Sequence, residues 1–279
     1  SPETVVSAHV LRKGLCKAYV AGTPENPRAA IVQSDFCAAE PAGFGRNPDL
    51  LWDLLTVVEG WDCFLVDSEC APRVAERMQA STGRKVGFIH DVNLQLDCPA
   101  DRFKDPCVRS LTPHDSALLS AAPPEVSGAG YRSVRDFLAH AIAAAAIVDG
   151  GIVSLAYTTA RSQRYADVGV HTLAPFRRRG FARSAASMVA ARVQEEGQTP
   201  VWSTGHFNTA SLKIVRDIGF TEFSRRTYVV TDKIENWEFA QQLRSPDGDK
   251  LRGDAPPSAR QGRLKADGTR STLRPCSGR

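Results

Sequence analysis

The segment that most constrains the fold of this chain is 167–184, DVGVHTLAPFRRRGFARS. The apolar residues at its start predict a strand over 164–173, and the small and apolar residues after it predict a long helix over 180–196. A loop with three consecutive arginines joins the two, and a glycine stands where the helix begins. A strand, a basic loop and a helix in this order indicate an α/β protein.

The start of the predicted helix has the properties of an anion site. Helix N-termini present unpaired N–H groups and the positive end of the helix dipole. Gly180 lets the backbone approach an anion closely, and the small Ala182 leaves the first turn uncluttered. Arg177, Arg178 and Arg179 raise the local potential and can contact phosphate. An arginine run is more often a solvated loop, but its position before a small-residue helix favours a phosphate site here.

The remaining chain alternates strands and helices and divides into three regions. Expected strands lie at 29–37, 62–67, 86–96, 143–148, 152–158 and 201–204, with a closing β pair at 220–223 and 226–231. Expected helices lie at 49–59, 71–79, 113–121, 133–141 and 208–217. Prolines after residue 98 mark a connection, so we expect an α/β domain of unknown role at 1–100 and a second domain at 101–235. The segment 236–279 has few large apolar residues, and we expect it to be disordered.

Charge differs between the two ends of the chain. Residues 1–130 contain 12 Lys+Arg and 17 Asp+Glu, whereas residues 131–279 contain 23 and 14. The basic part is expected to meet an anion. Nucleic acid is not the expected partner, because the sequence shows no aromatic residues interleaved with the basic ones and no nucleic-acid motif.

Several other classes are not expected. The longest apolar run, near 141–148, is too short to span a bilayer, and the first residues do not resemble a signal peptide. The seven cysteines include no CxxC pair, and their odd number favours reduced thiols in a cytoplasmic protein. No Cys/His spacing matches a zinc site, so no metal is expected.

Three motifs resemble the GCN5-related N-acetyltransferase (GNAT) superfamily. The pattern Arg177-x-x-Gly180-x-Ala182 after an apolar strand is similar to its Q/R-x-x-G-x-G/A signature. The pattern Asn208-x-x-Ser211, followed by IGF at 218–220, resembles its later N-x-x-A/S and L-G-F segment. The order of expected elements also matches over about residues 105–231.

Within the superfamily, PVW at 200–202 resembles the zwittermicin A resistance type of acetyltransferase, whose members also carry an N-terminal α/β extension. The resemblance implies a mixed, mostly antiparallel central sheet flanked by helices, preceded by that extension.

The resemblance also implies how acetyl-CoA binds as co-substrate. Its pyrophosphate would lie on the amides of 178–183, and its pantetheine would pair with the strand edge at 170–172, in a splay beside 201–204. Asn208 would cap its helix and touch the pantetheine or the sulfur. The residues expected to bind the donor are Val170, His171, Thr172, Arg177, Arg178, Arg179, Gly180, Phe181, Ala182, Arg183 and Asn208.

Catalysis would follow by direct attack of an amine on the thioester, helped by proximity and by a backbone N–H near Thr172. Asp167 is the candidate base, because it occupies a strand position where relatives often carry a glutamate; the alternative is an exposed carboxylate without a role. His171, on the same face of the strand, is a second candidate for proton transfer. His206 is a weaker one.

The candidate general acid departs from the family pattern. Many members carry a tyrosine four residues after the Ser211 position, but this chain has Val215. Ser211, Tyr228 or water would then serve, or the thiolate would leave unassisted. Trp202, Phe207 and Phe220 are expected in the core more than in an acceptor pocket.

The leading hypothesis is an acetyl-CoA-dependent N-acetyltransferase acting on a primary amine of a small molecule. The alternative is an acyl-CoA-binding module with weak or no catalysis and a protein-interaction domain at its N-terminus. The only partner expected is the small-molecule amine, without nucleic acid or membrane, and a homodimer is compatible with the sequence.

Overall fold

The computed structural model describes residues 1–23, 25–128 and 130–232. The tail expected at 236–279 lies outside these residues. The helices are α1 (Val5–Lys13), α2 (Pro48–Leu55), α3 (Ala71–Thr82), α4 (Ser116–Ser120), α5 (Val134–His140), α6 (Phe181–Glu195) and α7 (Thr209–Ile218). The strands are β1 (Cys16–Gly22), β2 (Pro27–Ser34), β3 (Ala42–Phe44), β4 (Cys63–Asp67), β5 (Val86–Gln95), β6 (Val108–Ser110), β7 (Ala143–Val148), β8 (Gly151–Arg161), β9 (Tyr165–Thr172), β10 (Thr199–Gly205) and β11 (Thr221–Thr231).

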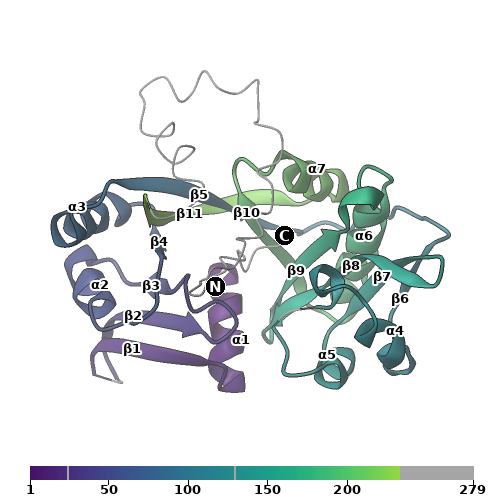
Figure 1. Ribbon diagram of the computed structural model, residues 1–279, viewed down its shortest axis with the longest axis horizontal. Helices are drawn as coiled ribbons and strands as arrows, with labels where there is room; N and C mark the ends of the chain where they lie inside the picture. Colours follow the sequence, from purple (N-terminus) through teal and green to yellow (C-terminus); the bar gives the residue numbers. More distant parts are fainter. Residues whose placement is uncertain (24, 129, 233–279) are drawn as a thin grey trace, which may run out of the picture.

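Within the described residues, the strands form a single 11-stranded sheet in the order β1-β2-β3-β4-β11-β5-β10-β9-β8-β7-β6. Neighbouring strands are antiparallel except in two pairs, β3 with β4 and β9 with β10. Helices flank this sheet (Figure 1). The expected mixed, mostly antiparallel sheet with flanking helices is therefore confirmed.

The strand order is nearly symmetric about its centre, where β11 and β5 pair. On each side an antiparallel pair leads to a third strand, and a helix, α2 or α6, connects that strand to a parallel neighbour. A second helix, α3 or α7, then leads to a last strand that crosses to the other side, so that β5 pairs with β10 and β11 pairs with β4. We call residues 1–95 the N-terminal half and residues 108–232 the C-terminal half (Figure 1). The expected domain boundary near residue 100 lies in the connection between them and stays a prediction.

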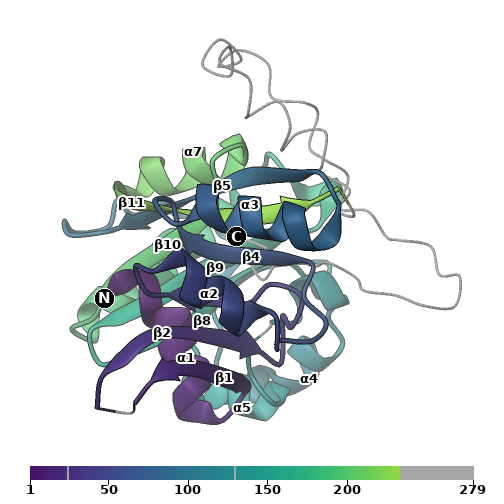
Figure 2. The ribbon, with the colours of Figure 1, turned by 90° about the vertical axis from the view of Figure 1, so that its left-hand side faces the viewer.

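Each half has a core on the face of the sheet that α2, α3, α6 and α7 cover. In the C-terminal half, Ala185, Ala186, Val189 and Val193 of α6 pack against strand residues, as the spacing of these residues predicted. In the N-terminal half, residues of α2 and α3 pack against β2, β4 and β5. Helix α1 lies on the other face and contacts strands of both halves, β1 and β2 as well as β8 and β9 (Figure 2).

Two details differ from the sequence predictions. The expected closing β pair is one strand, β11, whose register on β5 shifts between Glu222 and Ser224. Polar residues interrupt the apolar pattern of the sequence at this shift, so the sequence predicted two short strands joined by a turn. Helix α1 and strands β1, β3 and β6 were not predicted: α1 and β1 have no strong periodic pattern of buried residues, and β3 and β6 have only three residues each.

The cysteines agree with the expectation of reduced thiols at five positions. Cys16, Cys63, Cys70, Cys98 and Cys107 are free. Cys37, however, is disulfide-bonded, so the expectation does not hold there.

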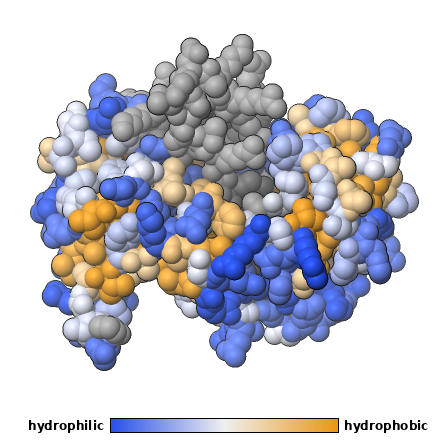
Figure 3. Space-filling model, turned by 60° about the horizontal axis from the view of Figure 1, so that its bottom comes forward, coloured by the Kyte–Doolittle hydropathy of each residue, from blue (hydrophilic) through white to orange (hydrophobic). Residues whose placement is uncertain are grey.

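The exposed surface also distinguishes the two halves. The large hydrophobic side chains exposed among the described residues are Leu11, Val20, Phe36 and Val57, all in the N-terminal half. On the face drawn in Figure 3, hydrophobic side chains gather on the left of the molecule and again at its upper right, and hydrophilic ones cover the lower right. None of the described helices has the length and apolar character needed to cross a membrane.

Candidate functional site

The junction between β9 and α6 leaves a helix N-terminus open. Gly180 is the N-cap, with a left-handed backbone (φ 87°) and no side chain to accept a bond from the first turn. A Cβ at this position would meet no atom within 4 Å, so the space in front of the helix is empty. Arg178 also has a left-handed backbone (φ 64°), which is uncommon for a residue with a side chain. The first-turn N–H groups are therefore available to an anion, as the sequence predicted.

The arginines around this N-terminus are held differently. The Arg177 Nε donates to the Thr172 carbonyl oxygen at 3.1 Å, and the Arg179 guanidinium lies 5.2 Å from the centre of the Phe176 ring. Arg183 pairs with Asp217 and stacks on an aromatic ring. In the part of the chain that the structure describes, Arg178 makes no comparable contact, so it is the guanidinium left to meet a ligand.

Strands β9 and β10 separate beyond their first residues. Their parallel ladder joins 199–201 to 165–167 and ends there, although β9 continues to Thr172 and β10 to Gly205. The opposite edge of β9 remains paired with β8 as far as Thr172. The ladder between β9 and β10 thus ends before Val170–Thr172, the stretch where the resemblance places the pantetheine.

Asp167 and His171 lie on the face of β9 turned away from α6. Ala166, Val168 and Val170 belong to the core under α6, so the alternate residues point to the other face. The Asp167 carboxylate accepts a hydrogen bond from the Thr159 hydroxyl. Asp167 is only 2% exposed, so the alternative that it is an exposed carboxylate is wrong. The catalytic roles of both residues stay predictions.

The start of α7 brings Asn208 and Ser211 together. The Asn208 Oδ1 accepts from the Ser211 N–H at 3.1 Å, which is the predicted cap. The Ser211 hydroxyl oxygen accepts from the Trp202 Nε1–H at 3.1 Å. Trp202 also packs edge-on against Phe220 at 6.0 Å, and both are buried, so these two aromatic residues belong to the core. Val215 is fully buried and offers no polar atom in its side chain.

His206 has a partner that the sequence did not reveal. Its ring centre lies 5.7 Å from that of His90 on β5. Its Nδ1 and its backbone N are 3.0 and 2.9 Å from the His90 carbonyl oxygen. Burial lowers the pKa of both imidazoles, and for His90 the neighbouring His206 lowers it further. No local pattern could have linked residues so far apart in the chain, because the exchange of β5 into the C-terminal half creates the contact.

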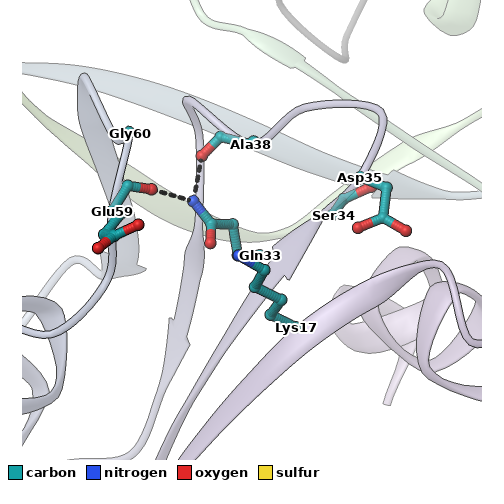
Figure 4. Close-up of a pocket in the computed structure, with 7 residues that line it drawn as sticks. All are labelled: Lys17, Gln33, Ser34, Asp35, Ala38, Glu59 and Gly60. Atoms are coloured by element: carbon teal, nitrogen blue, oxygen red, sulfur yellow. Dashed lines mark hydrogen bonds between the residues drawn. The ribbon is translucent and has the colours of Figure 1, made fainter.

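A separate hollow of about 350 Å³ opens in the N-terminal half, beside the end of β2 (Figure 4). The Gln33 side chain spans it, and its Nε2 donates to the carbonyl oxygens of Ala38 and Glu59 at 2.8 and 2.7 Å. No residue predicted for the site lines it. Among the described residues, no group of three or more His, Cys, Asp or Glu could hold a metal ion.

Comparison with known proteins found a matching family model and solved structures of similar fold. Residues 117–230 match the family model described as GNAT acetyltransferase. A comparison with curated proteins gave no match. Among solved structures, a GCN5-related N-acetyltransferase-like protein from Streptococcus suis 89/1591 is similar at 18% identity and a TM-score of 0.62. The alignment covers 82% of this chain and 93% of that one.

Two further structures show the same fold. A putative acetyltransferase of the GNAT family from Novosphingobium aromaticivorans is 18% identical, with a TM-score of 0.55 and coverage of 82% and 97%. A GCN5-related N-acetyltransferase from Kribbella flavida is 16% identical, with a TM-score of 0.55 and coverage of 82% and 93%. The family model thus matches residues 117–230, and the three solved structures show that the chain shares the fold of proteins described as GNAT acetyltransferases.

Proposed function

We propose that this protein transfers the acetyl group of acetyl-CoA to a primary amine on a small molecule. The observation that carries the proposal is the open N-terminus of α6 beside the separated strands β9 and β10. The first feature fits a pyrophosphate, and the second sets β9 and β10 apart over the stretch that the resemblance assigns to the amide-bearing pantetheine. The match of residues 117–230 to an acetyltransferase family supports the same donor.

In this proposal the donor lies between β9 and α6, bound by the residues named for it above. The backbone amides of 178–183, with Arg178, hold the pyrophosphate, and the edge of β9 at Val170–Thr172 holds the pantetheine. Asn208 caps α7 by accepting from the Ser211 N–H, and the bond from Trp202 Nε1 to the Ser211 hydroxyl joins the start of α7 to β10.

The reacting amine approaches from the opposite face of the sheet, where Asp167 and His171 lie. Asp167 accepts the proton of the attacking ammonium, since an ammonium has no lone pair with which to attack. The Thr159 hydroxyl bonded to its carboxylate holds that carboxylate in one position. His171 is the second candidate for this proton transfer. Ser211 is a weaker candidate acid, because its oxygen already accepts from Trp202.

Two finer assignments belong to the same proposal. PVW at 200–202 ahead of Asn208 supports the zwittermicin A resistance type, and the choice of a small-molecule amine follows from that resemblance. A cytoplasmic location is part of the proposal as well.

Binding and turnover measured side by side test the proposal. Calorimetry with acetyl-CoA is expected to show binding at one site per chain. Release of free CoA thiol, followed with a panel of cationic small amines, is expected to exceed the rate without amine. Absence of acetyl-CoA binding would overturn the proposal. Binding without amine-dependent thiol release over the whole panel would favour the acyl-CoA-binding module.

A further inference from the structure

Thr204, near the end of β10, carries a buried hydroxyl without a hydrogen-bond partner. The residue is 1% exposed, and its Oγ1 has no partner within the described part of the chain. A buried hydroxyl that makes no hydrogen bond destabilises a fold, so such groups are rare and need an explanation. A ligand that supplies the missing partner is one explanation.

The position of this hydroxyl points to the donor. Thr204 follows the residues of β10 that pair with β9, and continuation of that register brings it level with Val170 across the separated strands. Its side chain shares a face with Trp202, whose indole contacts Ser211 of α7. The hydroxyl therefore lies on the side of the gap that α6 and α7 cover, beside the strand edge assigned to the pantetheine.

The corresponding position of the N-terminal half has no hydroxyl. Val66 is the second-to-last residue of β4, and α3 begins five residues after it. Thr204 is the second-to-last residue of β10, and α7 also begins five residues after it. Val66 is fully buried, so a valine fills this place where no ligand is expected, and a threonine stands beside the proposed donor site.

The position where many family members carry a tyrosine is occupied by Val215, which has no polar atom to meet a sulfur. We propose that the Thr204 hydroxyl donates a hydrogen bond to the thioester sulfur of the bound donor and to the thiolate that leaves. This inference rests on the proposed function.

The step balances without a proton from Thr204. The amine nitrogen bonds to the carbonyl carbon, the C–S bond breaks, and its electron pair moves to the sulfur. The base takes the proton of the amine. The thiolate, stabilised by the Thr204 O–H, leaves as CoA and is protonated by solvent. A thiol of ordinary pKa near 8.5 is a leaving group that needs stabilisation more than full protonation.

The test compares Thr204→Val with the unchanged protein. Valine has nearly the shape of threonine, so we expect the ligand-free melting temperature to stay level or rise. We expect the affinity for CoA, measured by calorimetry, to fall about tenfold, as for a lost hydrogen bond to a charged or polar group. The pKa of the bound CoA thiol, followed by thiolate absorbance, is expected to rise in the variant. Thr204→Ser should restore both.

Two controls separate the outcomes. Thr199→Val makes the same change at the first residue of β10, where the strands are still paired, and should leave CoA affinity unchanged. Desulfo-CoA, which lacks the sulfur, should bind the protein and Thr204→Val equally. An equal loss of affinity for CoA and desulfo-CoA, an unchanged thiol pKa, or a lower ligand-free melting temperature would each overturn the sulfur contact. Failure of the unchanged protein to bind CoA would instead overturn the proposed function.

Discussion

The two halves of this molecule share one topology but differ at the N-terminus of one equivalent helix, which is α2 in the N-terminal half and α6 in the C-terminal half. In the N-terminal half, the Asn47 side chain accepts from the N–H groups of Asp49 and Leu50 at 3.0 and 3.1 Å. Pro48 has no N–H to offer, and the Asp49 carboxylate sits in the first turn. In the C-terminal half, Gly180 leaves the equivalent groups unpaired, and the first turn has no acidic residue.

This difference shows that the fold alone does not make a phosphate site. Both helices follow a strand, and both have a dipole whose positive end lies at the N-terminus. In α2, however, the Asn47 cap occupies the first-turn N–H donors, and the Asp49 carboxylate lies where a phosphate would bind. The site proposed at α6 differs from α2 in having no capping side chain, no acidic residue in the first turn, and a glycine at residue 180.

Separation of the two halves is expected to have the largest effect on the fold. Cutting the chain at residue 100 removes β10 and β11 from beside β5, and removes β11 from beside β4. We expect fragments 1–100 and 101–279 each to lack a cooperative melting transition, and their mixture to regain one. Circular dichroism during heating checks this. Cooperative melting of either fragment alone would show that the exchanged strands are dispensable and would favour the independent domain expected from the sequence.

A charge placed at Gly180 should close the C-terminal site as Asp49 closes the other. Gly180→Glu adds a carboxylate in front of α6, and we expect acetyl-CoA affinity to fall at least about 100-fold by repulsion of the pyrophosphate. Gly197→Glu is the matched control: that glycine follows the other end of α6, has φ 76°, and is equally open around its Cβ. The left-handed backbone costs both variants about 1 kcal/mol. Calorimetry decides, and equal affinities in the two variants would contradict the phosphate assignment.

Asp167 tests the reacting face of the C-terminal half. Asp167→Asn should lower kcat/KM by about 100-fold near neutral pH if the carboxylate is the base. The loss should shrink at high pH, where more of the amine substrate is already uncharged. Asp149→Asn, at the tip of the β7–β8 hairpin with φ 50°, where asparagine is well tolerated, serves as control. A loss that is the same at every pH would argue for His171 or water as the base.

The smallest effect is expected at the contact between His90 and His206, which joins strands from the two halves. Burial lowers the pKa of both imidazoles, so below about pH 6.5 the unfolded chain binds more protons than the folded one. Their contribution to stability is therefore present above that pH and is lost as the pH falls. Between pH 7.5 and 5, the melting temperature of His206→Asn should fall by a few degrees less than that of the unchanged protein. The exposed His114→Asn should leave that drop unchanged, and an unchanged drop in both variants would contradict the assignment.

The sequence predicted the parts of this structure that depend on neighbouring residues. The basic loop, the glycine before α6 and the Asn208 cap follow from local backbone chemistry, and each was expected where it is found. The exchange of β5 and β11 was not predictable, because strand pairing between residues far apart leaves no local periodicity. The same limit applies to the hydrogen bond between Thr159 and Asp167, because it forms where the register of β8 on β9 shifts at Thr159.

The covalent connection between the halves explains why their equivalent helix N-termini can differ in sequence. In a symmetric pair of identical chains, any substitution appears at both equivalent positions, so an asparagine cap and an open glycine could not coexist. The connection at 96–107 joins the halves covalently, which holds them at a high effective concentration whatever the dilution of the protein. Each half is then free to vary by itself. The C-terminal half has the open helix N-terminus proposed to bind the donor, and the N-terminal half, whose α2 is capped, contributes β5 to the sheet beside β10.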